Sequence, residues 1–202
     1  GSGKSTLVNL IPRFYDATGG MVLVDGVNVK DMPLQALREK IGIVPQKAVL
    51  FKGTLRDNIR WGKPDATDEE IYHALEIAQA RDFVDSKDEG LDLMIQQGGK
   101  NLSGGQKQLI AFARILVKNP SVLILDESTS AMDRDLEMFV MDLLSRLKRD
   151  KIILFISHRL HILKKYADYI YLIENGRVSH YGTHEEMMEG ENMYADYWRA
   201  FM

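Results

Sequence analysis

Short apolar runs alternate with helical periods along most of the chain. Four runs have the length of buried strands, and they lie within MVLVDG, IGIVPQ, SVLILDE and KIILFISH. A further stretch, YIYLIENGRVSHYG, predicts a hairpin that turns at Asn175 and Gly176. Helical periods lie between these runs, at 7–14, 136–147 and 160–166. Strands rich in Ile, Leu and Val that alternate with helices predict an α/β fold, with a mostly parallel sheet covered by helices on both faces.

The stretch 54–117 has a different pattern and carries no strong buried strand. Thr67 and Glu70 have the spacing of a capping box at the start of a helix. Ile71, Leu75 and Ala78 then line one face of that helix. We therefore expect an α-helical subdomain at 54–117, inserted into a core formed by 1–53 and 118–202.

Composition limits the possible classes of function. The chain has 202 residues, which suits one domain with an insertion. Its net charge of −3 gives no electrostatic footprint for nucleic acid, so we expect no nucleic-acid partner. It contains no cysteine, which excludes disulfides and thiolate metal sites. No apolar run approaches the roughly 18–20 residues that a membrane-spanning helix needs.

The first residues, GSGKST, have the form of the second half of a phosphate-binding loop. In the pattern G-x-x-x-x-G-K-[ST], Lys4 reaches the β- and γ-phosphates and the Ser5 hydroxyl reaches Mg²⁺. The first Gly of the pattern would fall three residues before Gly1, so we expect the loop and the first strands of the core to begin upstream. A flexible linker is the alternative, but the apolar run LVNLI that follows favours a phosphate loop. The predicted nucleotide ligands are Gly1, Ser2, Gly3, Lys4, Ser5 and Thr6.

A second candidate site follows the run SVLIL. This run delivers Asp126 and Glu127 to the carboxyl end of a buried strand, the edge at which α/β sheets bind ligands. Asp126 could hold Mg²⁺, and Glu127 could orient or deprotonate an attacking water. A simple strand end is the alternative, and the phosphate loop earlier in the chain argues against it.

A third candidate site is the segment NLSGGQ. Ser103 has the position of an N-cap, and its hydroxyl, the free backbone amides and the helix dipole together form an anion site. Gly104 and Gly105 each cost roughly 1 kcal/mol against Ala in a helix, so another requirement must favour bare backbone there. Either the chain binds two anions, or this second cradle serves a nucleotide held by another molecule.

These motifs, in this order, resemble the nucleotide-binding domain of an ATP-binding cassette (ABC) transporter, and the resemblance covers essentially the whole chain. LSGGQ matches the family signature, and LILDE resembles its Walker B strand with the catalytic Glu127. Gln46 in VPQ resembles the Q-loop glutamine. SAMD, which ends at Asp133, resembles the D-loop, and ISHR, with His158, resembles the H-loop. The segments PRFYDATGGMVLVDG, LFKGTLRDNI and GTHEEMM are similar to those of the exporter branch.

The resemblance implies a P-loop NTPase (RecA-like) fold that hydrolyses ATP with Mg²⁺. Two such domains pack head to tail, and each ATP lies between the Walker A loop of one domain and the signature of the other. The resemblance gives Gln46 a contact with Mg²⁺ or water, His158 a contact with the γ-phosphate and Asp133 a contact across the dimer. Metal ligands would be Ser5, Gln46 and Asp126, and the partner's γ-phosphate would meet Ser103, Gly104, Gly105 and Gln106.

The resemblance also implies that ATP-driven dimerisation powers export by transmembrane domains, at the cytoplasmic face of the cell membrane. One alternative is a soluble ABC ATPase of the DNA-repair or translation type. Repair-type members insert a long coiled coil before the signature, and no heptad run lies between Lys4 and Ser103. A catalytically inactive cassette is the other alternative. Glu127 and His158 are both present and the signature is intact, which favours an active ATPase.

Overall fold

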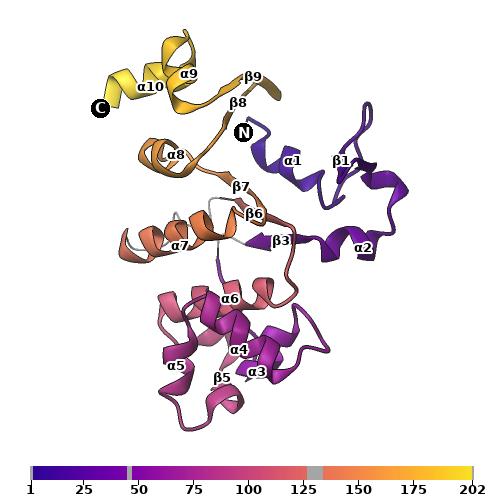
Figure 1. Ribbon diagram of the computed structural model, residues 1–202, viewed down its shortest axis with the longest axis vertical. Helices are drawn as coiled ribbons and strands as arrows, with labels where there is room; N and C mark the ends of the chain where they lie inside the picture. Colours follow the sequence, from indigo (N-terminus) through magenta and orange to yellow (C-terminus); the bar gives the residue numbers. More distant parts are fainter. Residues whose placement is uncertain (1, 45–46, 127–133, 202) are drawn as a thin grey trace. The chain divides into compact units, whose positions relative to one another are not determined.

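The computed structural model describes residues 2–44, 47–126 and 134–201 (Figure 1). The chain divides into two compact units, which are described separately. The first combines Gly1–Leu34 with Ile156–Met202, and the second is Gln35–Phe155.

The second unit is built on a three-stranded sheet in the order β3-β6-β7. Strands β3 (Ile41–Val44) and β6 (Val122–Asp126) are parallel. Strand β7 (Ile152–Ile156) is the third member and ends at the boundary between the units. The first four residues of β6 are buried, as expected for an apolar strand of a parallel sheet. The predicted parallel sheet with flanking helices is therefore confirmed.

Helix α6 (Gly104–Leu116) packs closely against this sheet. A Cβ atom at Gly42 would lie 2.5 Å from Cγ2 of Ile115, so only glycine permits this approach of β3 to α6. Helix α7 (Arg134–Leu147) follows in the chain and buries Val140 and Leu144. It was predicted at 136–147, so its C-terminal end is confirmed and it begins two residues earlier.

Short helices occupy most of the stretch 54–117, which lies wholly within the second unit (Figure 1). The capping box predicted at Thr67 and Glu70 is present at the start of α4, and Ile71, Leu75 and Ala78 are fully buried. A second capping box, formed by Thr54 and Asp57, starts α3. The elements are β4 (Gly53–Thr54), α3 (Leu55–Arg60), α4 (Asp68–Ile77), α5 (Arg81–Asp85), η2 (Gly90–Asp92), β5 (Met94–Ile95) and η3 (Gln97–Gly99).

The first unit begins with a shorter helix than the predicted 7–14. Helix α1 spans Lys4–Asn9, and the chain continues in tight turns through Arg13, whose φ is 57°. Pro12 accounts for the early end, because proline cannot donate the backbone hydrogen bond that would continue a helix. The predicted strand in MVLVDG is also only partly right. It is a two-residue strand, β1 (Leu23–Val24), paired antiparallel with β2 (Val27–Asn28) rather than placed in the parallel sheet.

The predicted hairpin at Asn175 and Gly176 is confirmed. It joins β8 (Ile170–Glu174) to β9 (Arg177–Gly182), and both turn residues have positive φ, as a tight hairpin turn requires. Met187, Tyr194 and Trp198 pack on Ile170 and form a small core with it. The other elements of this unit are η1 (Val29–Asp31), α2 (Leu34–Glu39, which continues into the second unit), α8 (Leu160–Tyr166, as predicted), α9 (His184–Glu189) and α10 (Met193–Phe201).

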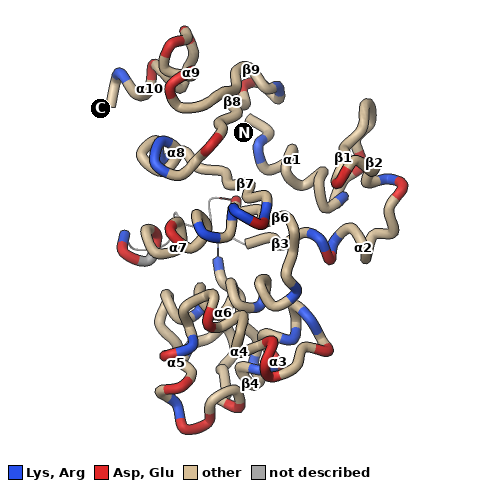
Figure 2. The backbone as a smooth tube through the Cα atoms, in the orientation of Figure 1, with Lys and Arg blue, Asp and Glu red and all other residues tan. Residues whose placement is uncertain are grey.

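Acidic and basic residues are interspersed along the described chain (Figure 2). In the same described ranges, every helix is too short or too polar to span a membrane.

Candidate functional site

The segment that directly precedes α1 is held in a specific backbone conformation. Gly3 has φ 94° and ψ 8°, a left-handed conformation that glycine adopts without steric cost. The carbonyl oxygen of Ser2 accepts a hydrogen bond of 3.2 Å from the amide of Gly176, in the turn between β8 and β9. Nζ of Lys4 donates to Oγ of Ser2 at 2.8 Å. The hairpin turn therefore supports the loop, and the lysine folds back over it.

The first turn of α1 follows this loop directly. No side chain caps it and no acidic residue lies in it. Ser5 and Thr6 are exposed there. Uncapped amides and the positive end of the helix dipole favour an anion at this place. This is the environment that the sequence predicts for the phosphates of a nucleotide.

Asp126 is the last residue of β6 and is half-buried. Leu125, directly before it, pairs with Val44 at the end of β3. A carboxylate at this strand end suits Mg²⁺, which takes one or two carboxylates and completes its shell with water and phosphate oxygens. In the ranges that the structure describes, no cluster of three or more acidic, His or Cys side chains could hold a metal.

The opening of α6 has the geometry of a capping box. Oγ of Ser103 accepts a 3.1 Å hydrogen bond from the Gln106 amide, and Oε1 of Gln106 accepts one of 2.9 Å from the Ser103 amide. The predicted N-cap is therefore present. The Ser103 hydroxyl proton and Nε2 of Gln106 are not used by this box and can still donate to a ligand.

Neither the space around Gly104 nor its backbone conformation requires glycine. A Cβ atom built on it would meet no atom within 4 Å, and its φ is not positive. No hydrogen bond within the described residues holds the amides of Gly104 and Gly105. Two glycines in a first helical turn lower the stability of the helix, and the packing does not require glycine at position 104. The sequence here therefore suits a ligand from outside the chain.

The remaining predicted residues divide into two groups. His158 is exposed and lies two residues after β7, in the first unit with Lys4 and Ser5. Gly1, Gln46, Glu127 and Asp133 lie outside the described residues.

The sequence analysis missed a contact between Asn58 and Arg114. The Arg114 guanidinium donates to the carbonyl oxygen of Asn58 at 2.8 Å and to its Oδ1 at 3.1 Å. Asn58 is only 1% exposed. The signal in the sequence was an arginine within the apolar helical run LIAFARIL, where a charged side chain needs buried acceptors.

Comparison with known proteins places this site in a family. Residues 1–130 match the family model described as ABC transporter. A multidrug export ATP-binding/permease protein, so named, of Staphylococcus aureus (strain NCTC 8325) is 46% identical over 194 residues, which are 96% of this chain and 33% of that protein. A relative of the same description in Bacillus subtilis (strain 168), YgaD, has the same identity and coverage. The chain thus spans about a third of the length of these relatives.

A solved structure agrees with these relatives. It is described as a bacterial Atm1-family ABC exporter with ATP bound. It matches 98% of this chain and 35% of its own, with a TM-score of 0.87 and 35% sequence identity. The sheet with its flanking helices agrees with this match. The chain belongs to the ABC transporter family, as one of its nucleotide-binding domains.

Proposed function

We propose that the chain binds and hydrolyses ATP to power export of a substrate across a membrane, by ATP-driven dimerisation with a second nucleotide-binding domain. The observation that carries this proposal is the start of α6, where Ser103 caps the helix and Gly104 leaves open space that the fold itself does not need. A nucleotide held by a partner domain is a ligand of the required charge. Export is supported by the relatives, whose names describe export ATP-binding/permease proteins.

The residues of the near side would act on the bound phosphates. Lys4 would leave Ser2 to pair with the β- and γ-phosphates, and the amides of the Gly3 turn would donate to them. Ser5, Gln46 and Asp126 would hold Mg²⁺, which neutralises charge on the phosphates. Glu127 would orient the attacking water and accept its proton, and His158 would contact the γ-phosphate.

The far side would complete the site from the partner domain. Ser103, Gly104, Gly105 and Gln106 would donate to the γ-phosphate that the partner holds, and Asp133 would reach across the dimer. Closure on ATP and reopening after hydrolysis would then move transmembrane domains at the cytoplasmic face of the membrane.

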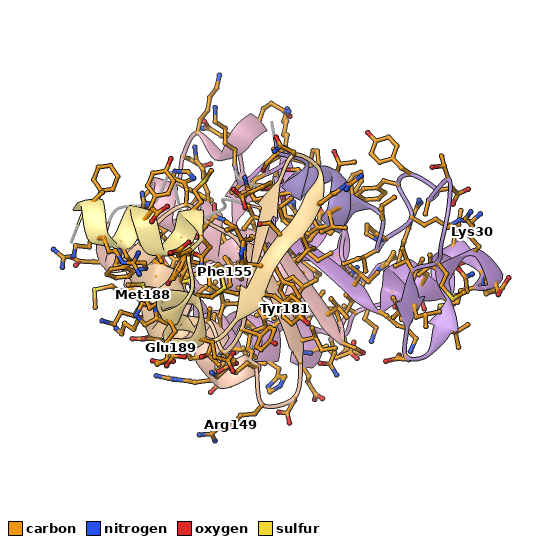
Figure 3. All side chains as sticks on the ribbon, turned by 90° about the horizontal axis from the view of Figure 1, so that it is seen from above. Lys30, Arg149, Phe155, Tyr181, Met188 and Glu189 are labelled. Carbon is orange, nitrogen blue, oxygen red and sulfur yellow. The ribbon has the colours of Figure 1, made fainter. Side chains whose placement is uncertain are left out.

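Lysine substitution tests the nucleotide site. Lys4→Ala should weaken binding of Mg·ATP at least about ten-fold, because a charged phosphate ligand is lost. Lys30→Ala is the matched control. Lys30 (labelled in Figure 3) lies in the same unit, and its Nζ donates to the carbonyl oxygen of Ala17 at 2.7 Å. Calorimetry of Mg·ATP binding to both variants measures this difference in affinity. Equal affinity in the Lys4 variant and the Lys30 variant would contradict the proposed site.

A further inference from the structure

The tip of the β8–β9 hairpin contacts the segment that precedes α1, within the first unit (Figure 1). The amide of Gly176 donates to the carbonyl oxygen of Ser2 at 3.2 Å. A Cβ atom at Gly3 would lie 3.7 Å from Cα of Gly176, so the two backbones meet at van der Waals distance. The hairpin therefore reaches this segment through its own backbone, at the turn.

The hydrogen bond fixes the plane of the peptide that joins Ser2 to Gly3. This peptide is trans, so its carbonyl oxygen and its N–H point in opposite directions. Because the Ser2 oxygen faces the hairpin, the Gly3 N–H faces away from it. Within the described residues the Gly3 amide donates to no oxygen, which leaves it available to a ligand. A carbonyl that accepts a hydrogen bond also polarises its own amide and makes the N–H a stronger donor.

The turn that supplies this donor is held at its tip and at its base. Asn175 and Gly176 have φ values of 50° and 74°, the left-handed pair of a tight hairpin turn. The rings of Tyr171 and Tyr181 stack across the two strands, with their centroids 6.0 Å apart. At the base of the hairpin, Ile170 belongs to the small core described above. The donor is thus part of an element that is ordered independently of the segment it contacts.

The same unit contains a second turn of the same conformation, between β1 and β2. Asp25 and Gly26 have φ values of 52° and 77°. In the described ranges the Gly26 amide donates to no oxygen. A Cβ atom would meet no atom within 4 Å at Gly26 or at Gly176. The two turns therefore match in conformation and in free space, and they differ in the hydrogen bond to Ser2.

We propose that Gly176 is a positioning residue of the nucleotide site, whose amide fixes the Ser2–Gly3 peptide so that the Gly3 N–H faces the bound phosphates. This inference rests on the proposed function. Gly176 itself touches no nucleotide in this account, and it acts through the Ser2 carbonyl. Because the contact joins two backbone groups, its test must change the backbone.

A one-atom change tests this role in the full polypeptide that carries this chain. Glycolate in place of Gly176 turns its N–H into an ester oxygen, which cannot donate, and the same change at Gly26 is the matched control. The Gly176 ester should raise KM for ATP about five-fold, the effect of one lost hydrogen bond. It should leave kcat within about two-fold, because the phosphates are held alike in the ground state and in the transition state. The Gly26 ester should leave both constants at their wild-type values.

Gly176→Ala separates the donor from the conformation of the turn. Alanine has room at this position but is strained at positive φ, so Gly176→Ala and Gly26→Ala should lower the melting temperature alike. Because the N–H is kept, Gly176→Ala should have a KM close to that of the wild type. If the turn served only the fold, KM would instead follow the melting temperature.

A further ester at Gly3 tests whether the two amides act through one peptide. Glycolate in place of Gly3 removes the donor that should meet the phosphates, and it should raise KM about ten-fold or more, because hydrogen bonds to charged groups are the stronger ones. Adding the Gly176 ester should then raise KM no further, since no Gly3 N–H is left to orient. Such non-additivity is expected only where two groups act through a shared contact.

The outcomes separate this inference from the proposed function. Equal KM values in the Gly176 and Gly26 esters would overturn the positioning role and leave ATP binding established. A KM in Gly176→Ala as high as in the Gly176 ester would do the same, and so would additive effects of the esters at Gly3 and Gly176. A Gly176 ester that fails to fold where the Gly26 ester folds would also overturn it, because the amide would then serve the fold. A wild type that binds no Mg·ATP would overturn the proposed function itself.

Discussion

Val44 pairs with Leu125 in the parallel ladder between β3 and β6, and both side chains are buried. Asp126 directly follows Leu125, and Gln46 follows Val44 by two residues. Neighbouring parallel strands end at the same edge of a sheet, which is where α/β folds bind ligands. Two of the proposed Mg²⁺ ligands therefore follow adjacent strand ends, although Gln46 itself lies outside the described residues.

Gly104→Ala separates function from stability at the start of α6. The open space at Gly104 means that the free energy of unfolding should stay unchanged or rise by up to about 1 kcal/mol, the helix propensity that alanine adds. ATPase activity should fall about ten-fold or more, because a methyl group would stand where the partner's phosphate must approach the backbone. Denaturant unfolding and steady-state turnover check the two halves. Turnover equal to the wild type would show that bare backbone is not needed there.

Gly62→Ala, unlike Gly104→Ala, should lower the stability of the fold. Its Cβ atom would lie 1.8 Å from the carbonyl oxygen of Arg114 and 3.2 Å from Cγ1 of Val117. The backbone oxygen cannot move aside cheaply, so the variant should lose about 3 kcal/mol of folding free energy. Urea unfolding compared with Gly104→Ala measures this loss. A Gly62 variant as stable as the wild type would mean that α6 and the end of α3 do not approach so closely.

Glu127→Gln tests the proposed general base. Its amide cannot accept the proton of the attacking water, so turnover should fall by ~10²–10⁴-fold. ATP binding should remain, and ATP should shift the protein toward a dimer because the closed state is no longer released. Light scattering with and without ATP, together with phosphate release, checks both effects. Turnover within a few-fold of the wild type would rule out this role for Glu127.

Low pH should destabilise the helical stretch 54–117, because protonation of Asp68 and Glu70 breaks their ion pairs. The hydrogen bond from Arg56 holds the pKa of Asp68 below its usual 3.8, and the hydrogen bond from Lys63 lowers the pKa of Glu70 from 4.5. A carboxyl whose pKa is lower in the folded state stabilises the fold above its unfolded pKa, and this contribution is lost as pH falls through the folded value. Melting temperature should therefore drop between about pH 5 and about pH 3.

The control for this pH effect is Arg56→Gln, which removes the hydrogen-bonding partner of Asp68 and leaves Arg60, 3.9 Å away, in place. Its melting temperature should fall less steeply over the same pH range, because the largest cause that lowers the pKa of Asp68 is gone. If the curves of melting temperature against pH run parallel for the wild type and the variant, the pair between Arg56 and Asp68 contributes nothing to the acid sensitivity.

Local sequence signals predicted much of the fold. The apolar runs predicted β3, β6 and β7, the Asn175-Gly176 pair predicted the hairpin, and the spacing of Thr67 and Glu70 predicted a capping box. These features depend on residues a few positions apart. Helix α1 ends at Asn9, before the end of the predicted helix 7–14, because Pro12 interrupts the apolar period there.

Contacts between distant residues could not be predicted in the same way. Arg114 meets Asn58 across 56 positions and Val49 across 65, and nothing in either local pattern specifies the partner. At the candidate site, the motif predicted that Ser103 would cap α6. It could not show that Gly104 has open space around it, because this depends on how the rest of the chain packs.

The central claim is that each ATP site is shared between two domains, and complementation of two inactive variants tests it most directly. Lys4→Ala removes the near side and Ser103→Arg blocks the far side, so each variant alone should be inactive. In a mixed dimer both defects fall in one composite site, and the other site keeps both halves intact. The account predicts that mixing restores ATPase activity, up to half of the wild-type value per dimer. Mixed dimers that are shown to form and yet remain as inactive as either variant alone would contradict it.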